Sequence, residues 1–139
     1  MNIHQTIALT SFSLLITASG CKTLNERVAA GAPTYAADAS IKLSPNKTGN
    51  GELLLEVEHL APPKRIDASN AGYVAWIVVE GQPPVKLGVL EYNERKRRGE
   101  LHATTPQKEF ILQITIEKDL AGATPAGTMI INHPIKAKY

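Results

Sequence analysis

The chain has one cysteine, Cys21, among its 139 residues. A chain with a single cysteine cannot close an internal disulfide, so packing alone must hold its core. No apolar run reaches the roughly 20 residues that a bilayer-spanning helix needs. The formal net charge is only +2. This charge is too small to favour nucleic acid as a partner.

Motifs of catalysis are also missing. The sequence contains no Gly-x-Ser-x-Gly motif and no glycine-rich loop that leads into a helix. His59, His102 and His133 each stand alone, without a second ligand at the spacing of a metal motif. These absences predict a non-catalytic protein without metal or cofactor. An enzyme whose site is assembled from scattered residues is the alternative.

The first twenty residues contain no Lys, Arg, Asp or Glu. Within them, residues 7–18 read IALTSFSLLITA, an apolar run of the length of a signal-peptide core. The small residues Ala18, Ser19 and Gly20 follow, and Cys21 comes directly after them. The pattern predicts a cleaved export signal over residues 1–20. A plain secretory signal with a chance cysteine, or a buried amphipathic start, is the alternative.

This stretch resembles the signal of bacterial lipoproteins. The resemblance implies a diacylglyceryl group on the Cys21 sulfur, cleavage before Cys21 and acylation of the new amine. Two or three acyl chains on one residue hold a protein on a membrane essentially permanently. Lys22 follows Cys21, where an Asp retains such lipoproteins at the inner membrane. The outer membrane is therefore favoured, with the domain facing the periplasm or the exterior.

Residues 22–38 read KTLNERVAAGAPTYAAD, rich in small and polar residues and interrupted by Gly31 and Pro33. No apolar period persists through them. We therefore expect residues 21–38 to form a lipidated, flexible tether. The alternative is a short helix over residues 23–30.

From residue 39 onward the pattern changes to apolar–polar alternation, interrupted by proline and glycine. In residues 52–59, for example, one face carries Leu53, Leu55 and Val57, and the other face carries Glu52, Glu56 and Glu58. The pattern predicts an all-β domain over residues 39–139, a single antiparallel β-sandwich of about seven strands. The prolines are expected between the strands. The predicted strands are residues 40–43, 52–59, 73–79, 85–92, 99–104, 109–117 and 128–132.

The apolar segment 73–79 is predicted to be a central strand. Its Trp76 is expected to fill the core between the sheets and to donate its indole N–H to a backbone carbonyl. Gly88 predicts a bulge or a close approach of the sheets. Gly122 and Gly127 are expected to bracket a turn.

Roughly residues 73–131 resemble the extracytoplasmic C-terminal domain of anti-sigma-K-type factors. The shared features are a strand with a central Trp76, the pair Leu87-Gly88, a strand ending in Glu117, and a loop with Thr124-Pro125. The resemblance implies an immunoglobulin-like sandwich. Nothing before Cys21 offers a sigma-binding helical domain, so we expect the fold of that family without sigma-factor inhibition.

Residues 93–99 read NERKRRG and place Arg95, Lys96, Arg97 and Arg98 in succession at a predicted hairpin tip. One interpretation is a solvated turn that also discourages edge-to-edge pairing. The other is an electrostatic contact with anionic headgroups, acidic cell-wall polymers or a partner protein.

Together these patterns predict a membrane-anchored lipoprotein of the bacterial cell envelope. Its sandwich would be a non-catalytic interaction module for an envelope protein or a cell-wall partner. The alternative is an extracytoplasmic sensor or regulatory domain, related to anti-sigma periplasmic domains but without sigma-binding capacity of its own.

Overall fold

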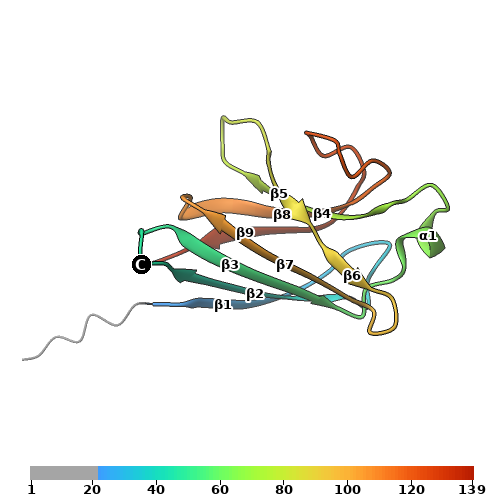
Figure 1. Ribbon diagram of the computed structural model, residues 1–139, viewed down its shortest axis with the longest axis horizontal. Coiled ribbons are helices and arrows are strands. Elements are labelled where there is room, and N and C mark those ends of the chain that lie inside the picture. The colour runs from blue at the N-terminus through green and yellow to red at the C-terminus, as the bar shows by residue number, and fades with distance from the viewer. Residues whose placement is uncertain (1–21) are drawn as a thin grey trace, which may run out of the picture.

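The computed structural model describes residues 22–139 as two antiparallel sheets packed face to face (Figure 1). The larger sheet has the strand order β1-β2-β3-β7-β6, and the smaller has the order β5-β4-β8-β9. One short helix, α1 (Pro63–Ile66), lies in the connection between the sheets. The strands are β1 (Leu24–Ala29), β2 (Asp38–Pro45), β3 (Gly51–Glu58), β4 (Gly72–Val78), β5 (Val85–Val89), β6 (Glu91–Asn93), β7 (Arg98–Thr105), β8 (Glu109–Glu117) and β9 (Thr128–Lys136).

This order confirms the predicted all-β, immunoglobulin-like sandwich. In an immunoglobulin domain, strands A, B, E and D form one sheet and strands C, F and G form the other. The segments β2-β3-β7-β6 and β4-β8-β9 reproduce those two orders, and β5 extends the second sheet beside β4. Strand β1 adds a further edge to the first sheet.

The core lies between the sheets and follows the alternation read from the sequence. On β3, Leu53, Leu55 and Val57 are buried, whereas Glu52 and Leu54 are exposed. Because each strand places alternate residues on opposite faces, one row of every strand enters the core. The largest side chains of this cluster with an exposed fraction below 2 % are Tyr73, Ile41, Leu43, Leu53, Leu55, Leu60, Leu112, Ile114, Ile116, Ile135 and Val57.

The prediction of a flexible tether over residues 21–38 is wrong from residue 24 onward, because Ala30, Thr34 and Ala37 are buried and β2 begins at Asp38. Residues 24–29 form β1, which pairs with β2 from Leu24↔Leu43 to Ala29↔Asp38. The sequence hides this strand because Glu26 occupies an inward position between Leu24 and Val28. The polar side chain is accommodated there by a hydrogen bond with His133 of β9. The alternative of a helix over residues 23–30 is also excluded.

Two further expectations need correction. The predicted strand 85–92 is divided at Leu90, where the chain leaves the smaller sheet as β5 and joins the larger sheet as β6. Together with β1, this division makes nine strands instead of about seven. Pro134, expected between strands, lies within β9. Strand β9 is an edge strand, where a missing amide donor is tolerated.

Every strand and every core side chain of the described structure comes from residues 24–139. All nine of these strands therefore lie after the predicted cleavage site before Cys21. The predicted signal peptide and the predicted lipidation of Cys21 lie outside the described residues. None of the helices within residues 22–139 has the length and apolar character required to cross a bilayer.

Candidate functional site

Strand β7 loses its neighbour halfway along its length. Strand β6 pairs with it only at three positions, from Glu91↔Glu100 to Asn93↔Arg98. Within the described chain, no strand pairs with residues 101–105 on that side. Strand β5, the edge of the other sheet, lies across the gap (Figure 1). Two free strand edges therefore face the same opening of the sandwich.

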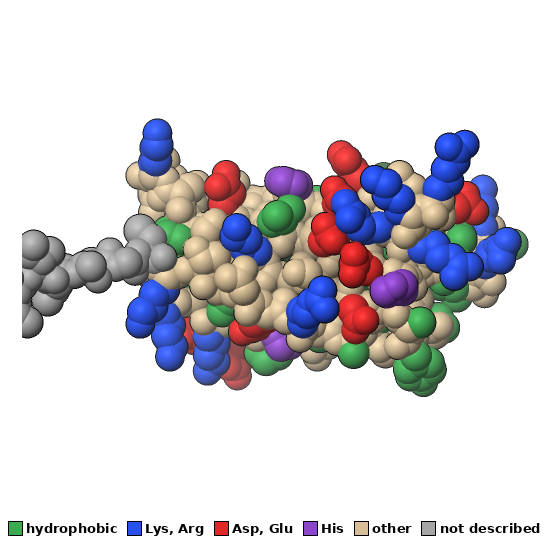
Figure 2. All heavy atoms as spheres, turned by 90° about the horizontal axis from the view of Figure 1, so that it is seen from below, with side chains coloured by type: hydrophobic (Ala, Val, Ile, Leu, Met, Phe, Trp, Pro, Cys, Tyr) green, Lys and Arg blue, Asp and Glu red, His purple; other side chains and the backbone are tan. Residues whose placement is uncertain are grey.

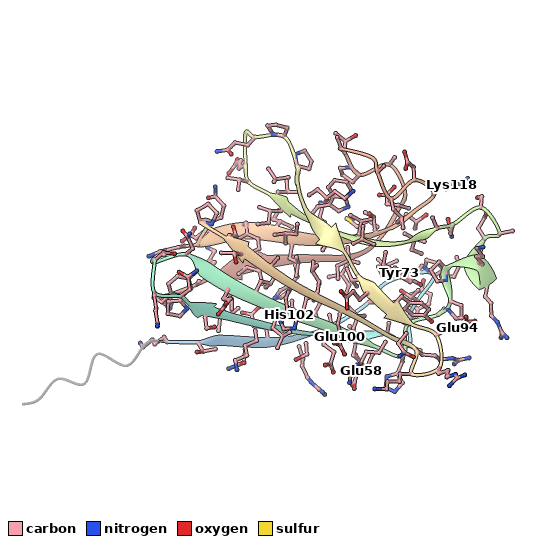
Figure 3. The ribbon with its side chains drawn as sticks, viewed as in Figure 1. Glu58, Tyr73, Glu94, Glu100, His102 and Lys118 are labelled. Carbon is pink, nitrogen blue, oxygen red and sulfur yellow. The ribbon has the colours of Figure 1, made fainter. Side chains whose placement is uncertain are left out.

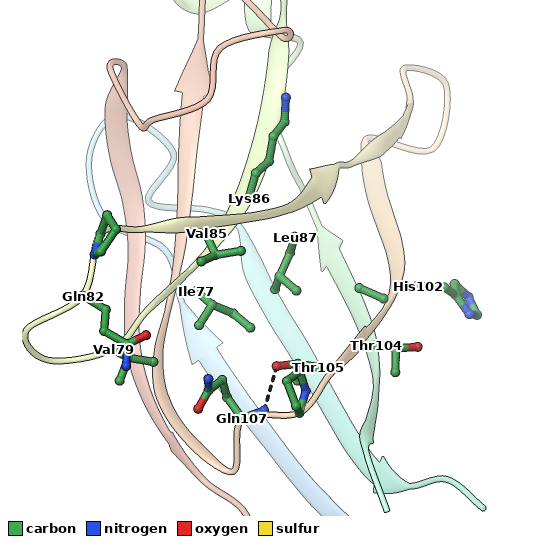
Figure 4. Close-up of a pocket in the computed structure, with 13 residues that line it drawn as sticks. Ile77, Val79, Gln82, Val85, Lys86, Leu87, His102, Thr104, Thr105 and Gln107 are labelled. Atoms are coloured by element: carbon green, nitrogen blue, oxygen red, sulfur yellow. Dashed lines mark hydrogen bonds between the residues drawn. The ribbon is translucent and has the colours of Figure 1, made fainter. Parts of the chain in front are cut away.

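The opening is an apolar groove with a volume of about 330 Å³ (Figure 4). Its apolar wall comes from β4 and β5 and includes Ile77 and Leu87, and Ala103 of β7 lies opposite. Val85 at its mouth has an exposed fraction of 58 %. Polar groups stand at the rim, and the Gln107 amide donates to Thr105 Oγ1 over 3.0 Å. The groove thus combines apolar walls with the unpaired backbone of an edge.

Gly88 closes one end of the groove. The register between β4 and β5 shifts between Ala75 and Trp76, so a bulge lies directly beside Gly88. A Cβ at Gly88 would come within 2.8 Å of Leu101 Cδ1 on β7. Both expectations for Gly88, a bulge and a close approach of the sheets, are confirmed. Beyond this contact toward Pro83 and Pro106, the groove is open.

The opposite side of the sandwich is closed. There β1 approaches β9, and His133 hydrogen-bonds Glu26 across the gap. The Gly31 amide also donates to the Ile130 carbonyl over 2.7 Å. Hydrogen bonds of side chains and of the backbone close the sandwich on that side. The core is therefore accessible from the side where β5 and β7 face each other.

Trp76 does not lie where the sequence predicts. Its neighbours Tyr73, Ala75 and Ile77 belong to the core cluster, whereas Trp76 lies on the other face of the smaller sheet. It is nevertheless only 1 % exposed, because loop residues 118–127 cover that face. Its indole N–H donates to the Thr115 hydroxyl over 2.8 Å, and not to a backbone carbonyl.

A chain of hydrogen bonds continues from Trp76 into the covering loop. The Thr115 hydroxyl donates to Glu117 Oε1 over 2.5 Å, and the Ala126 amide donates to the same oxygen over 3.1 Å. Glu117 is only 3 % exposed. From the β5 side, Lys86 Nζ donates to the Leu120 carbonyl and stands 5.9 Å from the Trp76 ring centroid. These buried polar groups hold the loop onto the sheet.

Gly127 ends the covering loop under a tight steric constraint. A Cβ at this position would overlap the Ile116 carbonyl oxygen of β8. Gly122 has more room, because its nearest neighbour would be the Asp119 carbonyl oxygen at 3.5 Å. Both glycines lie in the loop between β8 and β9, but the turn of that loop is at residues 120–121, so they do not bracket it.

The four basic residues of the predicted hairpin tip divide into two groups. Arg95, Lys96 and Arg97 are exposed in the turn between β6 and β7. Arg98 is partly buried and binds Glu100, with Glu56 Oε1 3.5 Å from its Nη1. The hydrogen bond with Glu100 is the largest cause of the raised pKa of Arg98.

Arg98 offsets repulsion on the outer face of the larger sheet. Glu56 lies directly opposite Glu100, which also faces Glu91 on β6. Like charges in directly opposed positions destabilise a sheet. Figure 3 shows Glu100, Glu58 and His102 together on this face. Arg98 therefore has a local structural role that the other three basic residues lack.

The three histidines belong to separate parts of the fold. His59 follows β3 with a positive φ of 55°, His102 lies on the rim of the groove, and His133 binds Glu26 on the closed side. No group of three or more His, Cys, Asp or Glu within residues 22–139 is arranged to hold a metal ion.

Sequence reasoning missed the groove, because strand pairing partners are not visible in a single sequence. Pro83 and Pro106, which line it, are expected from the sequence only to lie between strands. Comparison of the chain with protein-family models, with curated proteins and with solved structures finds no match in any of the three. The likenesses to lipoprotein signals and to anti-sigma-K-type domains therefore stay predictions.

Proposed function

We propose that this protein is a lipid-anchored component of the bacterial cell envelope, acylated at Cys21. Its sandwich is a non-catalytic interaction module, and the β5–β7 groove accepts an extended segment of a partner protein. The proposed binding of an extended segment rests on one observation. After Glu100, strand β7 has no neighbouring strand on the side of β6, and an apolar groove lies beside this free edge.

The groove has the two elements that strand addition requires. The edge at residues 101–105 has unpaired backbone groups, which can hydrogen-bond an incoming strand. The apolar wall at Ile77 and Leu87 accepts alternate side chains of that strand. Exposed edges of this kind are ordinarily covered or charged, because they invite pairing with other chains.

The position of β1 supports the anchor. Only Lys22 and Thr23 separate Cys21 from the first residue of β1. The strands and the core cluster of the described residues all come after Cys21 in the sequence, so acylation at Cys21 is compatible with a folded sandwich. The apolar residues 7–18 before it have the length of a signal-peptide core.

The anchor is tested by mass spectrometry of the protein purified from native membranes. The expected amino-terminal peptide begins at Cys21 and carries diacylglyceryl and acyl groups. Cys21→Ser should release the domain from the membrane fraction or leave its signal uncleaved. An unmodified thiol at Cys21, or an intact Met1 in the wild-type protein, would disprove acylation.

The groove is tested separately with a photo-crosslinking amino acid at Val85, at its mouth. We expect crosslinks to one extended peptide of a partner protein in the intact envelope, and their loss when Ala103→Met fills the groove. The control Asn25→Met, on the exposed edge strand β1, should leave them unchanged. Persistence of the crosslinks in Ala103→Met would disprove the site, and crosslinks to this chain would assign the groove to self-association.

A further inference from the structure

The fold brings a second group of basic residues to the predicted basic turn. Helix α1 carries Lys64 and Arg65, both exposed. The segment before α1 lies against the hairpin tip, because the Leu60 amide donates to the Arg97 carbonyl over 2.8 Å. Five exposed basic residues thus share one end of the molecule, and we call them the distal basic cluster: Lys64, Arg65, Arg95, Lys96 and Arg97.

A cavity of about 320 Å³ lies between α1 and the β6–β7 hairpin. Lys64 and Arg65 line one side, and Tyr92 and Glu94 of the β6–β7 hairpin line the other. Its remaining wall is mostly apolar and includes Pro62, Pro63, Val89, Leu90 and Leu120. A ligand seated there would meet apolar surface and positive charge together.

The cluster lies at the end of the sandwich opposite the start of β1. Leu24, the first residue of β1, pairs with Leu43 at the end where β2 turns into β3. The hairpin tip follows Asn93↔Arg98, at the other end of the same sheet. Figure 2 shows blue side chains at both ends of the molecule, including the end away from the start of the described chain, and Figure 3 places Glu94 at that end.

We propose that the distal basic cluster binds an acidic peptide segment of a partner protein, with an apolar side chain of that segment in the cavity. Arginine and lysine at this density attract carboxylates. The apolar wall favours a peptide over a purely polar polymer. The position opposite the anchor disfavours the protein's own membrane. This orientation rests on the proposed anchor at Cys21, whereas the charge and the cavity do not.

The test measures binding of a fluorescent peptide of alternating glutamate and leucine to unlipidated residues 22–139. A triple variant, Arg65→Gln, Arg95→Gln and Lys96→Gln, removes three positive charges from the cluster. The matched control, Lys47→Gln, Lys136→Gln and Lys138→Gln, removes three exposed charges at the other end. At about 0.1 M salt we expect at least tenfold weaker binding for the first variant and less than twofold for the control.

Three results would overturn the proposal. Equal weakening by both variants would mean that binding follows net charge alone. Equal affinity for a peptide of glutamates without leucine would remove the cavity from the site. Tighter binding to phosphatidylglycerol vesicles than to the peptide, lost in the cluster variant, would assign the cluster to a membrane. Because the protein in this test has no lipid, none of these results bears on acylation of Cys21 or on the groove.

Discussion

Tyr73 and Tyr92, which belong to opposite sheets, hydrogen-bond two adjacent carbonyl groups of the chain. The Tyr73 hydroxyl, on β4, donates to the Ala61 carbonyl over 2.6 Å. The Tyr92 hydroxyl, on β6, donates to the Leu60 carbonyl over 2.9 Å, and the ring centroids are 5.9 Å apart. The connection that leads to α1 is therefore held by both sheets, which fixes one side of the distal cavity.

Tyr73→Phe should lower stability and change its response to alkali. Burial raises the pKa of Tyr73, so the folded state holds the phenolic proton more tightly than the unfolded chain, whose tyrosines ionise near pH 10. The resulting stabilisation is present below about pH 10 and is lost as the pH rises beyond it. We expect a loss of about 1 kcal/mol at pH 7 and a shallower decline above pH 10, measured by urea unfolding. Tyr35→Phe, at a side chain 77 % exposed, should match the wild type.

Gly127→Ala should destabilise the sandwich strongly, because the new Cβ would overlap the Ile116 carbonyl. Backbone cannot move aside as a side chain can, so we expect a loss of about 3 kcal/mol in the free energy of unfolding. Gly122→Ala, in the same loop, has room and should change stability by less than about 1 kcal/mol. Equal effects of the two substitutions on thermal unfolding would contradict the packing of the loop on β8.

Thr115→Val should weaken the attachment of the covering loop. The substitution keeps the shape but leaves the Trp76 indole N–H and one bond of Glu117 without a partner. Buried polar groups left unpaired cost about 1–3 kcal/mol each, so a loss of about 2–3 kcal/mol is expected. The tryptophan emission should also shift, since Trp76 is the single Trp of the chain. Thr104→Val, at an exposed position, provides the control, and an unchanged emission spectrum in Thr115→Val would speak against the contact.

Removal of β1 should destabilise the fold. A chain that begins at Ala30 lacks the partly buried Leu24 and Val28, which pack against the core. The truncation also exposes to solvent the edge of β2 that otherwise pairs with β1. Partial burial of two such side chains corresponds to about 2–4 kcal/mol. Thermal unfolding of this chain against one that begins at Lys22 measures the difference. Equal midpoints would restore the prediction of a tether.

Alternation along the chain was sufficient to predict most strands, because one face of each sheet is buried and the other is wet. Residues 109–117 were predicted with the bounds that β8 has. Alternation did not predict β1, because the polar Glu26 points inward there. It also did not predict the division at Leu90, where one apolar run contributes a strand to each sheet. Alternation also could not predict on which face of β4 Trp76 lies, because both faces of this strand are apolar. The outer face is buried only because the long β8–β9 loop covers it.

The candidate sites depend on information that is not local. The basic residues of the hairpin tip were apparent from their sequence, but their association with Lys64 and Arg65 depends on the path from β3 to α1. The separation of Arg98 from its neighbours depends on register, because Glu56 and Glu100 meet only when β3 pairs with β7. The groove depends on the brevity of β6, and the sequence 85–92 reads as one continuous strand.

The pairing of β1 with β2 also determines how the domain would respond to a mechanical load. If Cys21 is fixed in a bilayer while a partner pulls at the hairpin tip, the force acts lengthwise along β1. The six residue pairs from Leu24↔Leu43 to Ala29↔Asp38 then carry the load together in shear, and are not opened one after another. Such a strand resists extraction, so a protein tied to a membrane at one end could transmit tension to its other end without unfolding.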